Sequence, residues 1–231
     1  MTMSPLHRML YSVKLMISGY GYGAIVCWGG LLFVLINADR WSIGNADPAT
    51  IVAVMSIGFP LFNILLFASL FAEDMEERTF GLLFTYPQKA AWLLLERIAP
   101  ALLLSMLVYW SCVVSAHFAL VRLSADQIWD IGKQVWPANL YLSMLALLCS
   151  LAGRGVLAGL GAAAGYWMLE LMTMGKWTGA LFLFQNVFHS RKVSVADNAV
   201  YLTAAAAVYM GLIVLLFVSG RRRWYRQEGS D

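Results

Sequence analysis

The sequence predicts an all-α integral membrane protein that crosses the bilayer six times. Of its 231 residues, 61% are hydrophobic and only 13% are charged, which is about half the charged share of a typical soluble domain. The hydrophobic residues also form long continuous blocks. A segment inside hydrocarbon must be a helix or a strand of a closed barrel, and barrel strands alternate apolar with polar residues. The continuous blocks therefore predict transmembrane helices.

Six blocks approach or reach the roughly 20 residues that a helix needs to cross the bilayer. They cover approximately residues 17–36, 51–72, 98–121, 135–153, 155–174 and 200–219. We expect all of residues 1–231 to form a single transmembrane domain.

Two further segments are expected to lie along the membrane surface. Residues 1–16 include a stretch, 5–16, in which apolar and basic side chains fall on opposite sides of a helix, which is typical of an interfacial helix. A cytoplasmic tail is the alternative. Residues 175–199 precede the last block on the extracytoplasmic side. Their apolar part, Trp177 to Phe188, is too short to span and predicts a short outer helix, re-entrant or interfacial.

The distribution of Lys and Arg predicts that both termini are cytoplasmic in a cell (plasma or inner) membrane. With the N-terminus inside, ten of these residues lie on the cytoplasmic side and six outside, as the positive-inside rule expects. Basic residues flank both the first and the last block, which requires an even number of crossings. Only residues 153–155 separate the fourth and fifth blocks. They predict a tight hairpin with Arg154 at the interface, and a single bent helix is the alternative.

The sequence lacks the residue patterns of the common enzyme sites. His7, His117 and His189 lie in different regions, and no pair has the spacing of helical metal ligands. The Gly175-Lys176 pair lacks the preceding glycine of a phosphate-binding loop. We therefore expect no catalytic residue, bound cofactor, metal or ATP site in this chain. The net charge of +3 gives no indication of nucleic-acid binding.

Two polar residues inside the predicted spans are candidates for a translocation path. Glu170 lies roughly 22 Å along the fifth span from Gly155, and an ionisable residue at such depth is by default a functional candidate. The alternative is that its carboxylate reaches the outer headgroups. Asn63 in the second span is a weaker candidate, because asparagine often serves only to hold helices together.

A stripe of small residues runs along the fifth span and includes Gly155, Gly159, Ala162 and Gly165. Small residues allow helix backbones to approach closely. The stripe therefore predicts a dimer interface or a sliding helix contact, with ordinary packing inside the chain as the alternative.

The charged segment 73–97 follows the second span. Its five acidic and three basic residues keep it out of the hydrocarbon, yet residues 80–84 are mostly apolar. Apolar residues within a charged loop predict a docking surface. A surface helix packed on its own chain is the alternative.

The order of these parts resembles the permease subunit of ABC-2 type transporters. The most specific match is residues 76–87, Glu-Glu-Arg-Thr-Phe-Gly-Leu-Leu-Phe-Thr-Tyr-Pro, against a family pattern of approximately Glu-Arg-Gly-Thr-Leu-Glu-Leu-Leu-Leu-Ser-Thr-Pro. The matching residues are Glu76, Thr79, Leu82, Leu83 and Pro87, and Phe80 and Thr85 are similar. Arg78 stands where the family usually has glycine.

The resemblance implies an ABC exporter permease that works as a dimer with a second copy or a homologous permease. Separate ATPase subunits would bind ATP and Mg²⁺, and the cytoplasmic loop 73–97 would carry the coupling helix. The implied coupling residues are Glu76, Glu77, Arg78, Thr79, Phe80, Leu82, Leu83 and Pro87, with the Arg154 hairpin as a second contact. The path would lie at the dimer interface, where Asn63 and Glu170 are tentative members. The substrate would be a hydrophobic peptide, a drug or a lipid-linked molecule.

Other function classes predict different features. A secondary transporter predicts several ionisable groups inside the membrane, and Glu170 is the only strong one. A membrane-embedded enzyme needs a catalytic cluster, which the sequence lacks. A non-transporting immunity or sensor protein would have no ATPase partner.

Overall fold

The computed structural model describes residues 19–37, 48–76, 90–120, 122–188 and 194–227. The elements in these ranges are α2 (Gly19–Asn37), α3 (Pro48–Ala68), α4 (Ala72–Glu76), α6 (Ala90–Ala119), α7 (Ala125–Gly153), α8 (Val156–Thr173), η1 (Gly179–Leu181), α9 (Gln185–Phe188) and α10 (Val195–Gln227). All regular structure in the described part of the chain is therefore helical, with no strand, which confirms the predicted all-α class. The predicted interfacial helix 1–16 lies outside the described residues.

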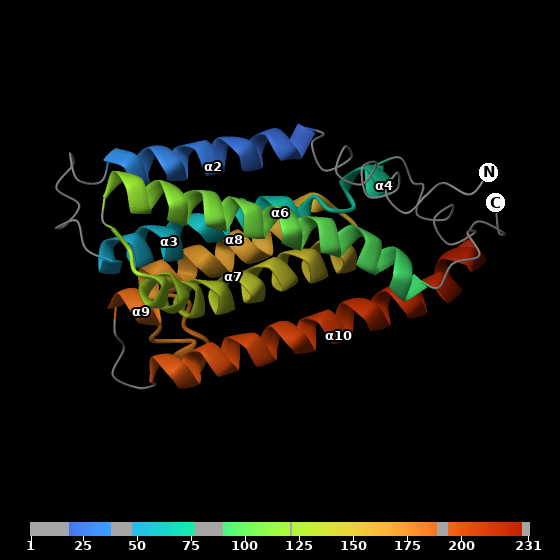
Figure 1. The fold of residues 1–231 in the computed structure, drawn as a ribbon. Helices are drawn as coiled ribbons and strands as arrows, with labels where there is room; N and C mark the ends of the chain where they lie inside the picture. Colours follow the sequence, from blue (N-terminus) through green and yellow to red (C-terminus); the bar gives the residue numbers. More distant parts are fainter. Residues whose placement is uncertain (1–18, 38–47, 77–89, 121, 189–193, 228–231) are drawn as a thin grey trace.

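The long helices lie side by side and alternate in direction (Figure 1). α2 begins and α10 ends at the same end of the bundle, which we call the proximal end; the other is the distal end. α7 lies at the centre and packs against α3, α8 and α10, while α2 packs against α3 and α6. The α4 helix and the turn between α7 and α8 both lie at the proximal end (Figure 1).

Five helices are long and apolar enough to cross a membrane, namely α3, α6, α7, α8 and α10. In α2, residues Tyr22–Asn37 form a shorter apolar helix. These helices indicate a multi-pass membrane protein. Several of them extend beyond the predicted apolar blocks. α7, for example, begins at Ala125 because Ser124 and Gln127 form a capping box, in which each side chain accepts a hydrogen bond from the other residue's backbone N–H.

The predicted hairpin between the fourth and fifth spans is confirmed. α7 ends at Gly153, and Arg154 adopts the left-handed conformation with φ 51° and ψ 40°. Its backbone N–H donates to the Ser150 carbonyl, which closes the end of the helix. α8 then begins at Val156, so the alternative of a single bent helix is wrong.

The predicted short outer helix over Trp177 to Phe188 is not one continuous helix. The structure instead has two separate short elements, η1 and α9. Positive φ angles of 71° at Gly175 and 57° at Gly179 interrupt helical geometry here. Residues 182–185 then turn inward and are buried in the bundle. We call residues 174–188 the distal segment.

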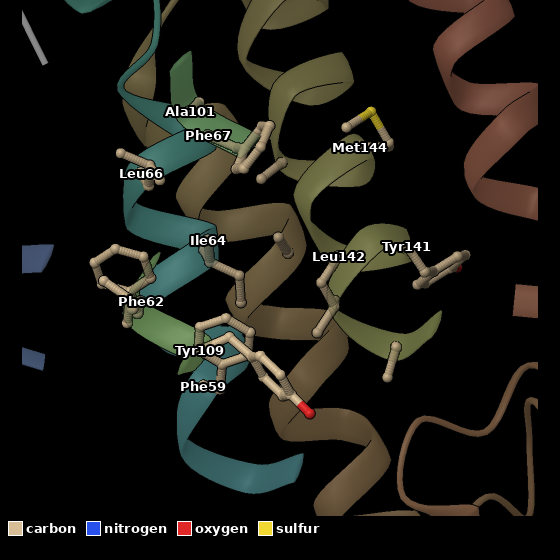
Figure 2. Close-up of a cluster of buried hydrophobic side chains, with 14 of the residues drawn as sticks. Phe59, Phe62, Ile64, Leu66, Phe67, Ala101, Tyr109, Tyr141, Leu142 and Met144 are labelled. Atoms are coloured by element: carbon tan, nitrogen blue, oxygen red, sulfur yellow. The ribbon is translucent and has the colours of Figure 1, made fainter. Parts of the chain in front are cut away.

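Aromatic and aliphatic side chains from three helices form the centre of the core (Figure 2). Phe59 of α3 is fully buried, and its ring centroid lies 6.0 Å from that of Trp136 on α7 and 6.1 Å from that of Tyr109 on α6. Leu142 and Met144 of α7 are buried in the same cluster. This packing fixes α7 against α3 and α6 and therefore positions the polar groups described below.

Candidate functional site

The ends of α3 and α7 and the start of α8 meet at the proximal end. The Ser150 hydroxyl of α7 donates a 2.9 Å hydrogen bond to the Ala68 carbonyl at the end of α3. A Cβ atom on Gly159 would lie 2.5 Å from the Ala146 carbonyl oxygen, 2.8 Å from Ser150 Cβ and 3.2 Å from Ala68 Cβ. Only glycine fits such a close approach. We call this contact of Ala68, Ala146, Ser150 and Gly159 the proximal junction.

Most of the predicted coupling residues, those from 77 to 87, lie outside the described residues. Glu76 ends α4, and its side chain is likewise not described. An ion pair of 3.2 Å between Arg97 of α6 and Asp74 of α4 joins the described segments on either side of residues 77–89. The two side chains are each only 13% exposed. The Arg97 guanidinium also lies 5.9 Å from the centre of the Phe71 ring. These contacts hold the end of α4 against the first turns of α6.

Arg154, the second predicted coupling residue, is exposed at the same end of the bundle as α4. Few residues separate α4 and Arg154 from the proximal junction. Ala68 belongs to the proximal junction and lies four residues before the start of α4, while Ser150 lies four residues before Arg154. The structure therefore brings the base of the charged segment and the α7–α8 hairpin together through one contact.

Asn63 lies at the centre of the bundle in a polar network that joins three helices. Its side-chain N–H donates to Asn139 Oδ1 of α7 at 3.0 Å, and the Ser105 hydroxyl of α6 donates to Asn63 Oδ1 at 2.7 Å. All three residues are buried. The sequence analysis missed Asn139 and Ser105, although each stands out as a polar residue in an apolar block. These contacts match the alternative in which Asn63 holds helices together, and they place it inside its own chain.

Glu170 is fully buried under the distal segment, with 0% of its surface exposed. The Thr178 and Tyr166 hydroxyls and the Leu183 backbone N–H lie near its carboxyl group. Within the described part of the chain, however, neither carboxylate oxygen has a well-formed hydrogen bond, and the Thr178 hydroxyl also lacks one. The Tyr166 hydroxyl instead donates to the Leu181 carbonyl at 3.1 Å. The alternative in which Glu170 reaches the headgroups does not fit this position.

Hydrogen bonds from three helices hold the distal segment over Glu170. The Tyr166 bond comes from α8. Asn198 of α10 donates to the Ala180 and Phe182 carbonyls at 2.8 and 3.0 Å. Asn186 in the segment donates to the Gln134 carbonyl of α7 at 2.8 Å. A buried carboxyl group without well-formed hydrogen bonds is costly, so the distal segment covers an energetically unfavourable group.

The predicted small-residue stripe divides into two parts. Gly159 packs inside the chain, as the proximal junction shows, and Gly155 is partly buried. Ala162 and Gly165 are exposed, and a Cβ on Gly165 would meet no atom within 4 Å. The first part thus serves packing within the chain, while the second lies on an open face of α8.

The described residues contain no group of three or more His, Cys, Asp or Glu side chains that could hold a metal ion. No protein-family model matches the sequence, and no curated protein matches it significantly.

Proposed function

We propose that this chain is the membrane-spanning permease subunit of an ATP-driven ABC exporter, which works as a dimer with separate ATPase subunits. The proximal end is cytoplasmic, in agreement with the Arg221–Arg223 cluster near the end of α10. α2 is the first of six spans, since its 19 residues cover about 28 Å and the hydrocarbon core is about 30 Å thick.

The proximal junction is the observation that carries the proposal. An ATPase-driven movement needs a rigid route from the docking loop to the spans. Here the Arg97–Asp74 ion pair joins the two helices that flank the loop. The Ser150–Ala68 hydrogen bond and the Gly159 contact join the start of that region to α7 and α8. A push on the coupling residues 76–87 therefore reaches four long helices through these contacts.

ATP binding and hydrolysis supply the free-energy difference between two arrangements of the spans. The open face of α8 around Ala162 and Gly165 is proposed to meet the second permease copy. Glu170 is closed off by the distal segment in this arrangement and becomes part of the path when that segment moves. The substrate class remains a hydrophobic peptide, a drug or a lipid-linked molecule.

Replacing Glu76 and Leu82 together with alanine should uncouple ATP hydrolysis from transport while leaving membrane insertion intact. The change removes a charged and an apolar contact from the proposed docking helix. The measurement compares ATP hydrolysed with substrate moved in vesicles that contain the chain and its ATPase. A matched control replaces one exposed acidic and one exposed apolar residue at the distal end, Asp126→Ala with Val200→Ala. Unchanged coupling in the Glu76/Leu82 variant would remove the assigned role of the loop.

A secondary transporter is the second candidate, and the buried Glu170 is the observation that favours it. Ion-coupled transporters use ionisable groups inside the membrane. This candidate predicts transport that depends on an ion or proton gradient and continues without any ATPase. Gradient-driven transport by the purified chain alone would select it over the exporter.

A further inference from the structure

Two hollows flank the first turns of α7 at the distal end. The first, with a volume of about 470 Å³, lies between α6 and α7 and has walls that include Tyr109, Trp110 and Trp129. The second, of about 580 Å³, lies between α7 and α10 and includes Leu140 and Ala199 among its walls. Lys133 and Trp136 line both. Each volume falls in the range of small-molecule sites.

The rim between the two hollows carries one positive and one negative charge, since Lys133 lines both hollows and Asp130 lines the second. Lys133 Nζ lies 3.1 Å from Asp130 Oδ1, and the two side chains are 59% and 62% exposed. The ammonium group also lies 5.7 Å from the centre of the Trp129 ring. Such an exposed ion pair contributes little by itself. Both charges are therefore accessible to the complementary charges of an external molecule.

In a membrane-embedded chain, we infer that this rim lies at headgroup depth, because Asp130 and Lys133 precede the apolar block 135–153. α7 has 29 residues, whereas roughly 20 suffice to cross the hydrocarbon, so its first turns reach the interface. Tryptophan is enriched at that level, and Trp129 lies there beside Lys133, while Trp110 and Trp136 line the part of the first hollow that lies within the apolar blocks. A molecule bound here therefore meets charges at the rim and apolar walls below, which is the chemistry of a membrane lipid.

We propose that Lys133 and Asp130 bind the headgroup of a zwitterionic diacyl phospholipid whose acyl chains enter the hollows on the two sides of α7. The lipid phosphate would contact Lys133, and its ammonium group would contact Asp130. An anionic lipid offers no positive group to Asp130, so the pair favours a headgroup with both charges. The proposal depends on membrane insertion alone and holds for an exporter or a secondary transporter.

The test uses the purified chain in phosphatidylglycerol vesicles that contain a minor fraction of phosphatidylethanolamine brominated in its acyl chains. Bromine quenches nearby tryptophan, so a saturable component of the quenching reports occupancy beside the three tryptophans of the first hollow, above the unsaturable quenching of the six other tryptophans. We expect stronger, saturable quenching than with brominated phosphatidylglycerol at the same fraction, and competition by unlabelled phosphatidylethanolamine. Lysophosphatidylethanolamine, with one acyl chain, should compete less well. Equal competition by the one-chain lipid would overturn the use of both hollows.

The double variant Lys133→Gln with Asp130→Asn should bind the zwitterionic lipid at least about tenfold more weakly, since each lost bond involves a charged group. The matched control Lys176→Gln with Asp126→Asn changes an exposed Lys and Asp of the distal end outside both hollows and should retain the selective quenching. Equal quenching by the two brominated lipids would overturn the proposal. So would cross-linking of a Lys133→Cys variant to Lys133→Cys of a second copy, because the hollows would then be a protein interface.

Discussion

Replacing Gly159 with alanine should lower the stability of the folded chain by about 1–3 kcal/mol, the usual cost of overpacking a well-packed contact. The added Cβ would lie 2.5 Å from the Ala146 carbonyl oxygen. That oxygen belongs to the backbone of α7 and cannot rotate away as a side chain could. Alanine is the better helix former by about 1 kcal/mol, so a loss of stability would show that the clash outweighs propensity. The measurement is the thermal unfolding midpoint of the purified protein in one detergent.

Gly165→Ala in the same helix is the matched control. A Cβ at Gly165 would meet no atom within 4 Å, so this variant should be neutral or more stable, by at most about 1 kcal/mol. An equal loss of stability in the two variants would mean that close packing at the proximal junction does not specifically require glycine at position 159. If Gly165→Ala instead lowered stability only in the assembled protein and not in the isolated chain, the second permease copy would lie on this face.

Replacing Glu170 with methionine should raise stability and abolish transport. The carboxyl group is fully buried and neither oxygen has a well-formed hydrogen bond. An unsatisfied buried polar group costs about 1–3 kcal/mol, and methionine has a similar length without polar atoms. A gain in stability with a loss of function is typical of a residue kept for its activity. The unfolding midpoint and substrate transport are measured on the same preparation.

Glu170→Gln serves as the control for shape, because it keeps a polar side chain of the same length that cannot ionise. We expect transport to fall in this variant as well. A drop in stability in Glu170→Met would contradict the functional role, since it would show that the carboxyl group stabilises the distal segment through Thr178 or Leu183. Full transport by both variants would remove Glu170 from the path.

The sequence predicts those parts of the fold that depend on local properties. The length of an apolar block sets whether a helix can span, and Arg154 between two glycines is a local signal for a turn. The hairpin was therefore predictable. The distal segment was not, because its course depends on positive φ angles at Gly175 and Gly179 and on the inward burial of residues 182–185. An apolar stretch in the sequence does not show whether its side chains enter the bundle.

The partners of the polar residues also could not be predicted. The position of Asn63 in an apolar block indicates a special role, but its pairing with Asn139 and Ser105 depends on how α3, α6 and α7 are rotated. The same holds for the small-residue stripe. Helical periodicity puts Gly159 and Gly165 about 120° apart, at opposite edges of the stripe, yet only the packing of α3 and α7 shows that one is covered and the other open.

The most direct test of the proposed exporter is affinity purification of the tagged chain from its native membrane in mild detergent. We predict a near-stoichiometric soluble ATPase with a phosphate-binding loop, which is lost when Glu76 and Leu82 are replaced together. Recovery of the chain alone across several detergents would contradict an ABC permease and favour the secondary transporter.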